Sequence, residues 1–193
     1  RFLWLVAVTT LNFAALFLYI SSAPAVVLGH WGMGEQDFGW FFVPAIAGMM
    51  IGAWATGRAA GRFDARTMVA SGFACCFVAT VVNAAYAGLA PAPVYPWAVL
   101  PLVLLSFGVA LVFPQLMLQM LDLYPTQRGS ASSMQAFLSL MFQAGVAGLL
   151  SPLLSAEPWR LAAAALLLSS AALALWRWGD AQLLRRVAEI AAG

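Results

Sequence analysis

The chain has 193 residues, of which 64% are hydrophobic and only 8% are charged. Because a soluble domain carries about 25% charged residues, this composition excludes a soluble enzyme, a nucleic-acid-binding protein and a disordered chain. The formal net charge is +2 and all 9 basic residues are arginines, so the placement of these arginines is more informative than their number.

Six stretches of the chain are long and apolar enough to cross a membrane. A spanning helix needs roughly 20 apolar residues, and helices are expected because hydrocarbon offers no partner to an unpaired backbone group. The runs are rich in Leu and Ala and lack the alternation of barrel strands, so the predicted fold class is an all-α membrane protein. The predicted spans are 2–28, 38–56, 67–88, 97–120, 130–154 and 159–178.

Residues 179–193 follow the last span as a predicted cytoplasmic tail. Leu183, Leu184, Val187 and Ile190 recur at helical spacing, while the arginines and the glutamate of the tail take other faces. This amphipathic pattern favours a short helix lying on the membrane surface, and a frayed tail is the alternative.

The arginines predict which way the spans run. With the N-terminus inside, eight of the nine arginines lie in inner segments and only Arg160 lies in an outer loop. Inner loops of membrane proteins are enriched in Arg and Lys, so both termini are predicted to be cytoplasmic. The use of Arg without Lys favours a bacterial source, and the predicted location is the bacterial cytoplasmic membrane. Because the chain begins with Arg1 rather than Met, we expect a piece of a longer protein.

Uncharged polar residues line up along individual spans. Ser132, Gln135, Ser139 and Gln143 are spaced three, four and four residues apart, which places them on one stripe of a helix. An amide that faced lipid would lack a hydrogen-bond partner, so such faces should point to other helices or to a water-filled cavity. Two interpretations of this stripe stay open: its residues form hydrogen bonds between helices, or they line a ligand site. Similar faces hold Gln115 and Gln119 in the fourth span, and Asn12, Leu16 and Tyr19 in the first.

No Asp, Glu, Arg or His lies near the middle of any predicted span. An ionisable residue there is the usual mark of a proton or ion pathway, so a proton-coupling group is not expected within this chain. His30, the single histidine, is expected to be a solvated residue of an outer loop. No spacing typical of metal ligands occurs, and neither a metal nor a cofactor is expected.

Proline and glycine predict where helices bend and where they touch. Pro24 in the first span, and Pro101 and Pro114 in the fourth, should bend their helices. Spans one and four correspond if the six spans form two inverted triplets, an arrangement in which broken helices mark a transport site. Gly48 and Gly52 form a G-x-x-x-G pattern, which favours close approach of another helix backbone.

The loop between the second and third predicted spans reads Gly-Arg-Ala-Ala-Gly-Arg-Phe-Asp-Ala-Arg. It resembles the signature loop of the major facilitator superfamily of transporters. Gly57 matches the opening glycine of that motif, Arg62 its central arginine and Arg66 its closing base, whereas Gly61 replaces an acid and Asp64 replaces a glycine. In that superfamily the C-terminal half carries a degraded copy. The resemblance therefore implies the C-terminal six-helix half of a twelve-helix fold, built from two inverted three-helix repeats.

The bases of this loop have two possible roles. Arg58, Arg62 and Arg66 could pair with acids or helix C-termini of a neighbouring bundle and hold one face of a transporter closed. Alternatively, they are simply retained on the inner side of the membrane. The predicted gating loop comprises Gly57, Arg58, Arg62 and Arg66.

Two further stretches resemble drug-efflux proteins of the Bcr/CflA subgroup. Residues 17–24 resemble their seventh helix, and residues 128–133 with the following glutamine resemble the entry to their eleventh. The resemblance implies proton-coupled export of small amphipathic compounds, with protons carried through a missing N-terminal half. The cavity would then offer aromatic rings and adaptable polar groups. The cavity candidates are Asn12, Phe13, Phe17, Tyr19, Gln115, Gln119, Gln135, Ser139 and Gln143.

Other functions stay open from the sequence. A major facilitator carrier for sugars or organic acids is one alternative, and a self-assembling six-span module is another. A rhomboid-type protease would need a membrane serine with a membrane histidine, and the only histidine lies in a predicted loop, so catalysis is not expected. The expected partners are the lipid bilayer, a small-molecule substrate and the N-terminal six-helix half of the same protein.

Overall fold

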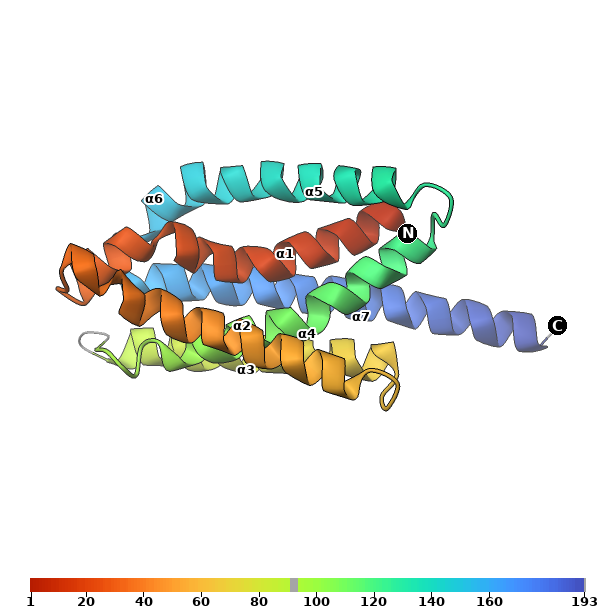
Figure 1. Cartoon of the computed structure of the whole chain (residues 1–193), viewed down its shortest axis with the longest axis horizontal. Coiled ribbons are helices and arrows are strands. Elements are labelled where there is room, and N and C mark those ends of the chain that lie inside the picture. Colours follow the sequence, from red (N-terminus) through yellow and green to blue (C-terminus); the bar gives the residue numbers. More distant parts are fainter. Residues whose placement is uncertain (91–93, 193) are drawn as a thin grey trace.

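The computed structural model describes residues 1–90 and 94–192, and it describes side chains as far as residue 182. Within these residues, six helices are long and apolar enough to cross a membrane. They lie roughly alongside one another as a bundle, and both termini emerge at the same end (Figure 1). We call this end of the bundle the terminal end.

The helices follow the predicted spans to within a few residues at most of their ends. The first span is interrupted, because α1 stops at Ser21 and a π-helical turn, η1, follows. The fifth span is likewise interrupted by a second π-helical turn, η3. The bounds are α1 Phe2–Ser21, η1 Ala25–His30, η2 Glu35–Phe38, α2 Gly39–Ala59, α3 Ala65–Leu89, α4 Leu100–Asp122, α5 Arg128–Gly145, η3 Val146–Leu150, α6 Ser151–Leu154 and α7 Pro158–Ala192.

The predicted tail continues the last span. α7 runs without a break from Pro158 to Ala192, so the backbone of the tail is part of the same helix. The residues of its predicted apolar face begin at Leu183, and the structure describes side chains only as far as residue 182. Its placement on a membrane surface stays a prediction.

The prolines act differently from one another. α1 ends three residues before Pro24, which has no N–H to donate back along the helix. α4 continues through Pro114. The prediction that Pro101 bends its helix is wrong, because Pro101 lies in the first turn of α4. A first-turn residue needs no intrahelical partner for its N–H, so proline starts this helix without distorting it.

Glycines bring three helices into close contact. A Cβ atom on Gly52 of α2 would lie 2.7 Å from the carbonyl oxygen of Phe107 in α4, and Gly48 faces the α4 backbone in the same way. The close approach predicted from the G-x-x-x-G pattern is therefore confirmed. On the other side of α4, a Cβ on Gly108 would lie 2.7 Å from the carbonyl oxygen of Gly72 in α3. The pair α2–α4 and the pair α3–α4 both depend on these small residues.

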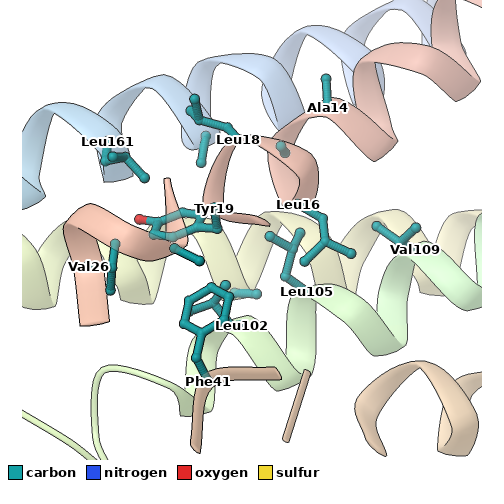
Figure 2. Packing of buried hydrophobic residues seen from close by; sticks show 14 of the residues in the cluster. Ala14, Leu16, Leu18, Tyr19, Val26, Phe41, Leu102, Leu105, Val109 and Leu161 are labelled. Carbon is teal, nitrogen blue, oxygen red and sulfur yellow. The ribbon is translucent and has the colours of Figure 1, made fainter. Parts of the chain in front are cut away.

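Two buried clusters fill the bundle. One lies toward the end away from the termini, where Tyr19 packs among Val26, Leu102 and Leu161 (Figure 2). The other lies near the terminal end, and Phe73 of α3 stacks there on Trp176 of α7. α1, α3, α4 and α7 supply most of this core, while α5 lies along one edge of the bundle (Figure 1).

Candidate functional site

Three phenylalanines form a half-exposed aromatic surface on α1 and α4. The ring centroids of Phe13 and Phe17 lie 6.1 Å apart, and those of Phe13 and Phe113 lie 6.4 Å apart. Phe113 is 38% exposed, and the two α1 rings are half-buried. Phe113 was not among the predicted cavity residues, because an apolar residue in an apolar span carries no signal of its own. We call these three residues the aromatic face.

The polar stripe of α5 faces α1. Thr10 Oγ1 and Ser139 Oγ lie 2.7 Å apart, and Gln135 Nε2 donates to the same serine oxygen at 3.0 Å. Gln143 Nε2 donates to the carbonyl oxygen of Thr10 at 3.5 Å. Ser132 instead bonds within its own helix, to the carbonyl oxygen of Gly129. Of the two interpretations of the stripe, hydrogen bonding between helices accounts for these contacts.

Two buried amide oxygens have no hydrogen-bond partner within the described part of the chain. They are Oδ1 of Asn12, which is 1% exposed, and Oε1 of Gln143, which is 4% exposed. Leaving such an acceptor unpaired costs about 1–3 kcal/mol. Each of these amide oxygens is therefore an acceptor that the described residues leave unused.

The remaining cavity candidates lie elsewhere. Tyr19 is buried in the core and accepts a hydrogen bond from Asn83 of α3, so it does not join the aromatic face. Gln115 is half-buried on α4. Gln119 lines a pocket of about 570 Å³ at the terminal end, together with Trp4. The structure thus brings only some of the predicted cavity residues together.

Hydrogen bonds also join the first and fifth spans near the end away from the termini. Ser22 Oγ and Ser151 Oγ lie 2.7 Å apart, and both residues are buried. His30 Nε2 lies 2.8 Å from the carbonyl oxygen of Ser155. The prediction that His30 is a solvated loop residue is wrong, because it is half-buried at the end of η1 and bonded to the fifth span. η3 lies between α5 and Ser151, whereas η1 begins after Ser22 and ends at His30.

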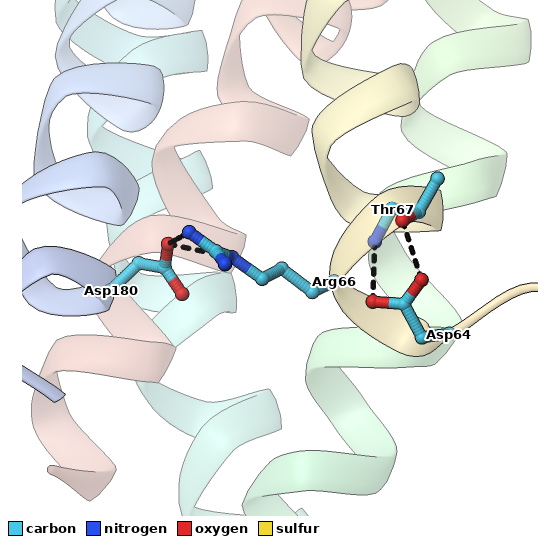
Figure 3. A network of polar contacts seen from close by, with 4 residues as sticks. All are labelled: Asp64, Arg66, Thr67 and Asp180. Atoms are coloured by element: carbon cyan, nitrogen blue, oxygen red, sulfur yellow. Dashed lines mark hydrogen bonds and ion pairs between the residues drawn. The ribbon is translucent and has the colours of Figure 1, made fainter. Parts of the chain in front are cut away.

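An ion pair links α3 to α7 at the terminal end. Arg66 Nε and Nη2 reach Asp180 Oδ2 at 2.9 and 2.7 Å (Figure 3). The partner of Arg66 thus belongs to the same chain and not to a neighbouring bundle. No local pattern indicates this pairing, because the two residues lie 114 positions apart.

Asp64 has a structural role at the start of α3. Its carboxylate accepts from the backbone N–H and the hydroxyl of Thr67, which caps the helix (Figure 3). The hydroxyl of Thr67 is the main cause that lowers the pKa of Asp64. The departure from the signature motif at this position therefore has a local reason. An aspartate three residues before a threonine, just ahead of an apolar run, is the sequence pattern that could have indicated this helix cap.

The other loop residues have simpler surroundings. Gly61 has a φ of +77°, a conformation that side chains rarely adopt, so a glycine suits this turn. The guanidinium of Arg58 lies 5.2 Å from the ring centroid of Trp54. Arg62 and Gly57 are exposed. Among the three bases of the loop, Arg66 is the one that the described residues engage in an ion pair.

Comparison with known proteins bears on the fold. No family model matches the chain, and no curated protein matches it. The chain is similar to the crystal structure of a D-xylose-proton symporter, with a TM-score of 0.67 and 18% identity. The match covers 99% of this chain and 52% of the symporter, so the chain spans about half the length of that protein. The chain therefore shares the fold of about half of that symporter, in agreement with the predicted half of a twelve-helix major facilitator fold.

This result confirms the predicted all-α fold class with six helices able to span a membrane. The arrangement of these helices as two inverted three-helix repeats stays a prediction. The chain is accordingly a multi-pass membrane protein. At this level of identity the similarity concerns the fold and does not reach the drug-efflux subgroup.

Proposed function

We propose that the chain is one lobe of a secondary active transporter that exports small amphipathic compounds in exchange for protons. The aromatic face carries this proposal. Phe13, Phe17 and Phe113 offer apolar surface that the bundle itself does not cover. Such surface suits apolar ring systems, and the nearby amides of the α1–α5 contact offer adaptable hydrogen bonds.

A second six-helix lobe would complete the transporter. In the apolar stretches of the second and fifth spans, which contain α2 and α5, 22% and 17% of the residues are buried inside the bundle. The corresponding share in α1 is 61%. These two helices therefore have the most surface left for a partner, which we propose is the N-terminal half of the same protein. The solved structure of similar fold is about twice as long as this chain.

Proton coupling would depend on that other lobe. The acids of this chain all lie outside its predicted spans, as Asp64, Asp122 and Asp180 do. Proton transfer at the bilayer midplane needs an ionisable side chain there. The arginine pattern supports a cytoplasmic position for both termini, and that orientation is part of the proposal.

A sugar carrier is the second candidate. It is favoured by the similarity to the D-xylose-proton symporter. A sugar would require hydrogen bonds more than aromatic surface, and the unpaired acceptors of Asn12 and Gln143 are the groups that this lobe offers.

Transport into membrane vesicles with an imposed pH gradient distinguishes these candidates. The full-length protein is assayed with a fluorescent amphipathic cation and with radiolabelled xylose. We expect Phe113→Ala to weaken transport of the cation by about two- to twelvefold, since aromatic contacts contribute roughly 0.5–1.5 kcal/mol beyond their buried area. Phe137→Ala is the matched control, because Phe137 is exposed on α5 outside the aromatic face.

The outcomes separate the candidates cleanly. Transport of xylose without transport of the cation would replace the first proposal with the second. If Phe113→Ala and Phe137→Ala reduce the gradient-dependent uptake of the cation equally, the aromatic face is not part of the substrate site. Absence of gradient-driven transport of either compound would refute proton coupling.

A further inference from the structure

A groove runs between α3 and α7, which pack against each other on the side of the bundle away from α5 (Figure 1). Its apolar part has a volume of about 490 Å³, and its polar part, nearer the terminal end, has a volume of about 450 Å³. Ala70, Trp176 and Arg177 line both parts, so the two are continuous. We propose that this groove binds one anionic phospholipid, with an acyl chain between the helices and the phosphodiester beside Arg177.

The shape of the apolar part suits an acyl chain. Ala70 and Ala74 of α3 face Ser170 and Ala174 of α7 across it. These small side chains leave a hollow between two helices that touch elsewhere, as Phe73 and Trp176 do. A hydrocarbon chain gains dispersion contacts along such a hollow.

The apolar part of the groove fits within one leaflet of a bilayer. Its lining on α3 extends from Ala70 to Val78, which is about 12 Å along a helix at 1.5 Å per residue. Half of the hydrocarbon core of a bilayer is about 15 Å thick. The exposed indole of Trp178 adjoins Arg177, and tryptophan prefers the headgroup level. The polar part therefore lies where a phosphate would lie.

The charges of the polar part leave one arginine for an anionic lipid. Asp64 and Asp180 both line this part, and Asp180 is paired with Arg66. The carboxylate of Asp64 keeps its charge, but it caps α3, where the positive end of the helix dipole offsets part of that charge. Arg177 is exposed and forms no ion pair with the described residues. It is thus the arginine that contacts the phosphodiester, as basic side chains between membrane helices do with anionic headgroups.

This site is separate from the aromatic face, which lies on α1 and α4. It depends on the chain spanning a bilayer and not on which substrate is carried. A failure of drug or sugar transport therefore leaves the lipid proposal unaffected, and loss of lipid binding leaves the transport proposal unaffected.

Native mass spectrometry of the full-length protein in detergent tests the proposal. Dioleoylphosphatidylglycerol and dioleoylphosphatidylcholine are titrated separately, so that only the headgroup differs. We expect the anionic lipid to bind about fivefold more tightly, the factor for one arginine near an anionic surface, about 1 kcal/mol. Arg177→Gln should abolish this preference. Arg128→Gln is the control, because Arg128 lies at the terminal end, pairs with Asp122 and does not line the groove.

Two further measurements test where the acyl chain lies and whether the site binds a free anion instead of a lipid. Ala74→Trp should fill the apolar part and weaken binding of both lipids, with unchanged helicity by circular dichroism. An excess of inorganic phosphate should leave the lipid adducts in place. Equal affinity for the two lipids, a preference that survives Arg177→Gln, full binding by Ala74→Trp, or displacement by phosphate would each overturn the proposal.

Discussion

The contact between α2 and α4 can be tested with a single methyl group. In Gly52→Ala, the new Cβ would lie 2.7 Å from the carbonyl oxygen of Phe107 and 2.8 Å from Cβ of Ala110. Ordinary van der Waals contact begins at 3.4 Å, so the helices must separate by several tenths of an ångström. Overpacking of this kind costs about 1–3 kcal/mol. We expect Gly52→Ala to destabilise the bundle accordingly.

Gly57→Ala is the matched control on the same helix. Nothing lies within 4 Å of a Cβ at Gly57, so this substitution carries the helix-propensity gain of alanine without the clash. That gain is about 1 kcal/mol at either position, and it cancels when the two variants are compared. The difference between them therefore reports the helix contact alone.

Thermal unfolding in detergent, followed by circular dichroism, measures this difference. A free-energy change of 1 kcal/mol shifts Tm by roughly 2–4 °C for a protein of this size. We expect Gly52→Ala to melt about 2–12 °C below Gly57→Ala. Equal melting temperatures for the two variants would refute the close contact between α2 and α4.

Three further predictions concern the polar contacts. Asp64→Ala should lower Tm at pH 7. The loss in Tm should shrink as the pH falls through the lowered pKa of Asp64, because a carboxylate whose pKa is depressed in the folded state stabilises the protein only while it is ionised. A loss in Tm that persists at acid pH would contradict this role. A double-mutant cycle on Thr10 and Ser139 should give a coupling of about 0.6 kcal/mol, and additivity would exclude their hydrogen bond. A cycle on Arg66 and Asp180, measured by Tm, should give at most about 1 kcal/mol at low salt and less in high salt, since the arginine is 55% exposed; a salt-independent coupling would contradict the ion pair.

Local patterns in the sequence determined the spans and some of their contacts. Hydropathy depends on runs of neighbouring residues, so the number of membrane-spanning helices and most of their ends could be predicted. The interruption near Pro24 followed from a missing backbone donor. The small residues Gly48 and Gly52 indicated a close helix contact, although not that α4 would be the partner.

The tertiary structure decided which faces meet. The polar stripe through Ser139 is visible in the sequence, but its partner Thr10 is 129 residues away. The same holds for the ion pair of Arg66 and for the aromatic face, where Phe113 joins two rings of another helix. In lipid, apolar side chains gain little by choosing one neighbour over another, so pairing depends on close packing and on a few hydrogen bonds. Those interactions form only once the helices are assembled, so a pattern of neighbouring residues does not indicate which helix supplies the partner.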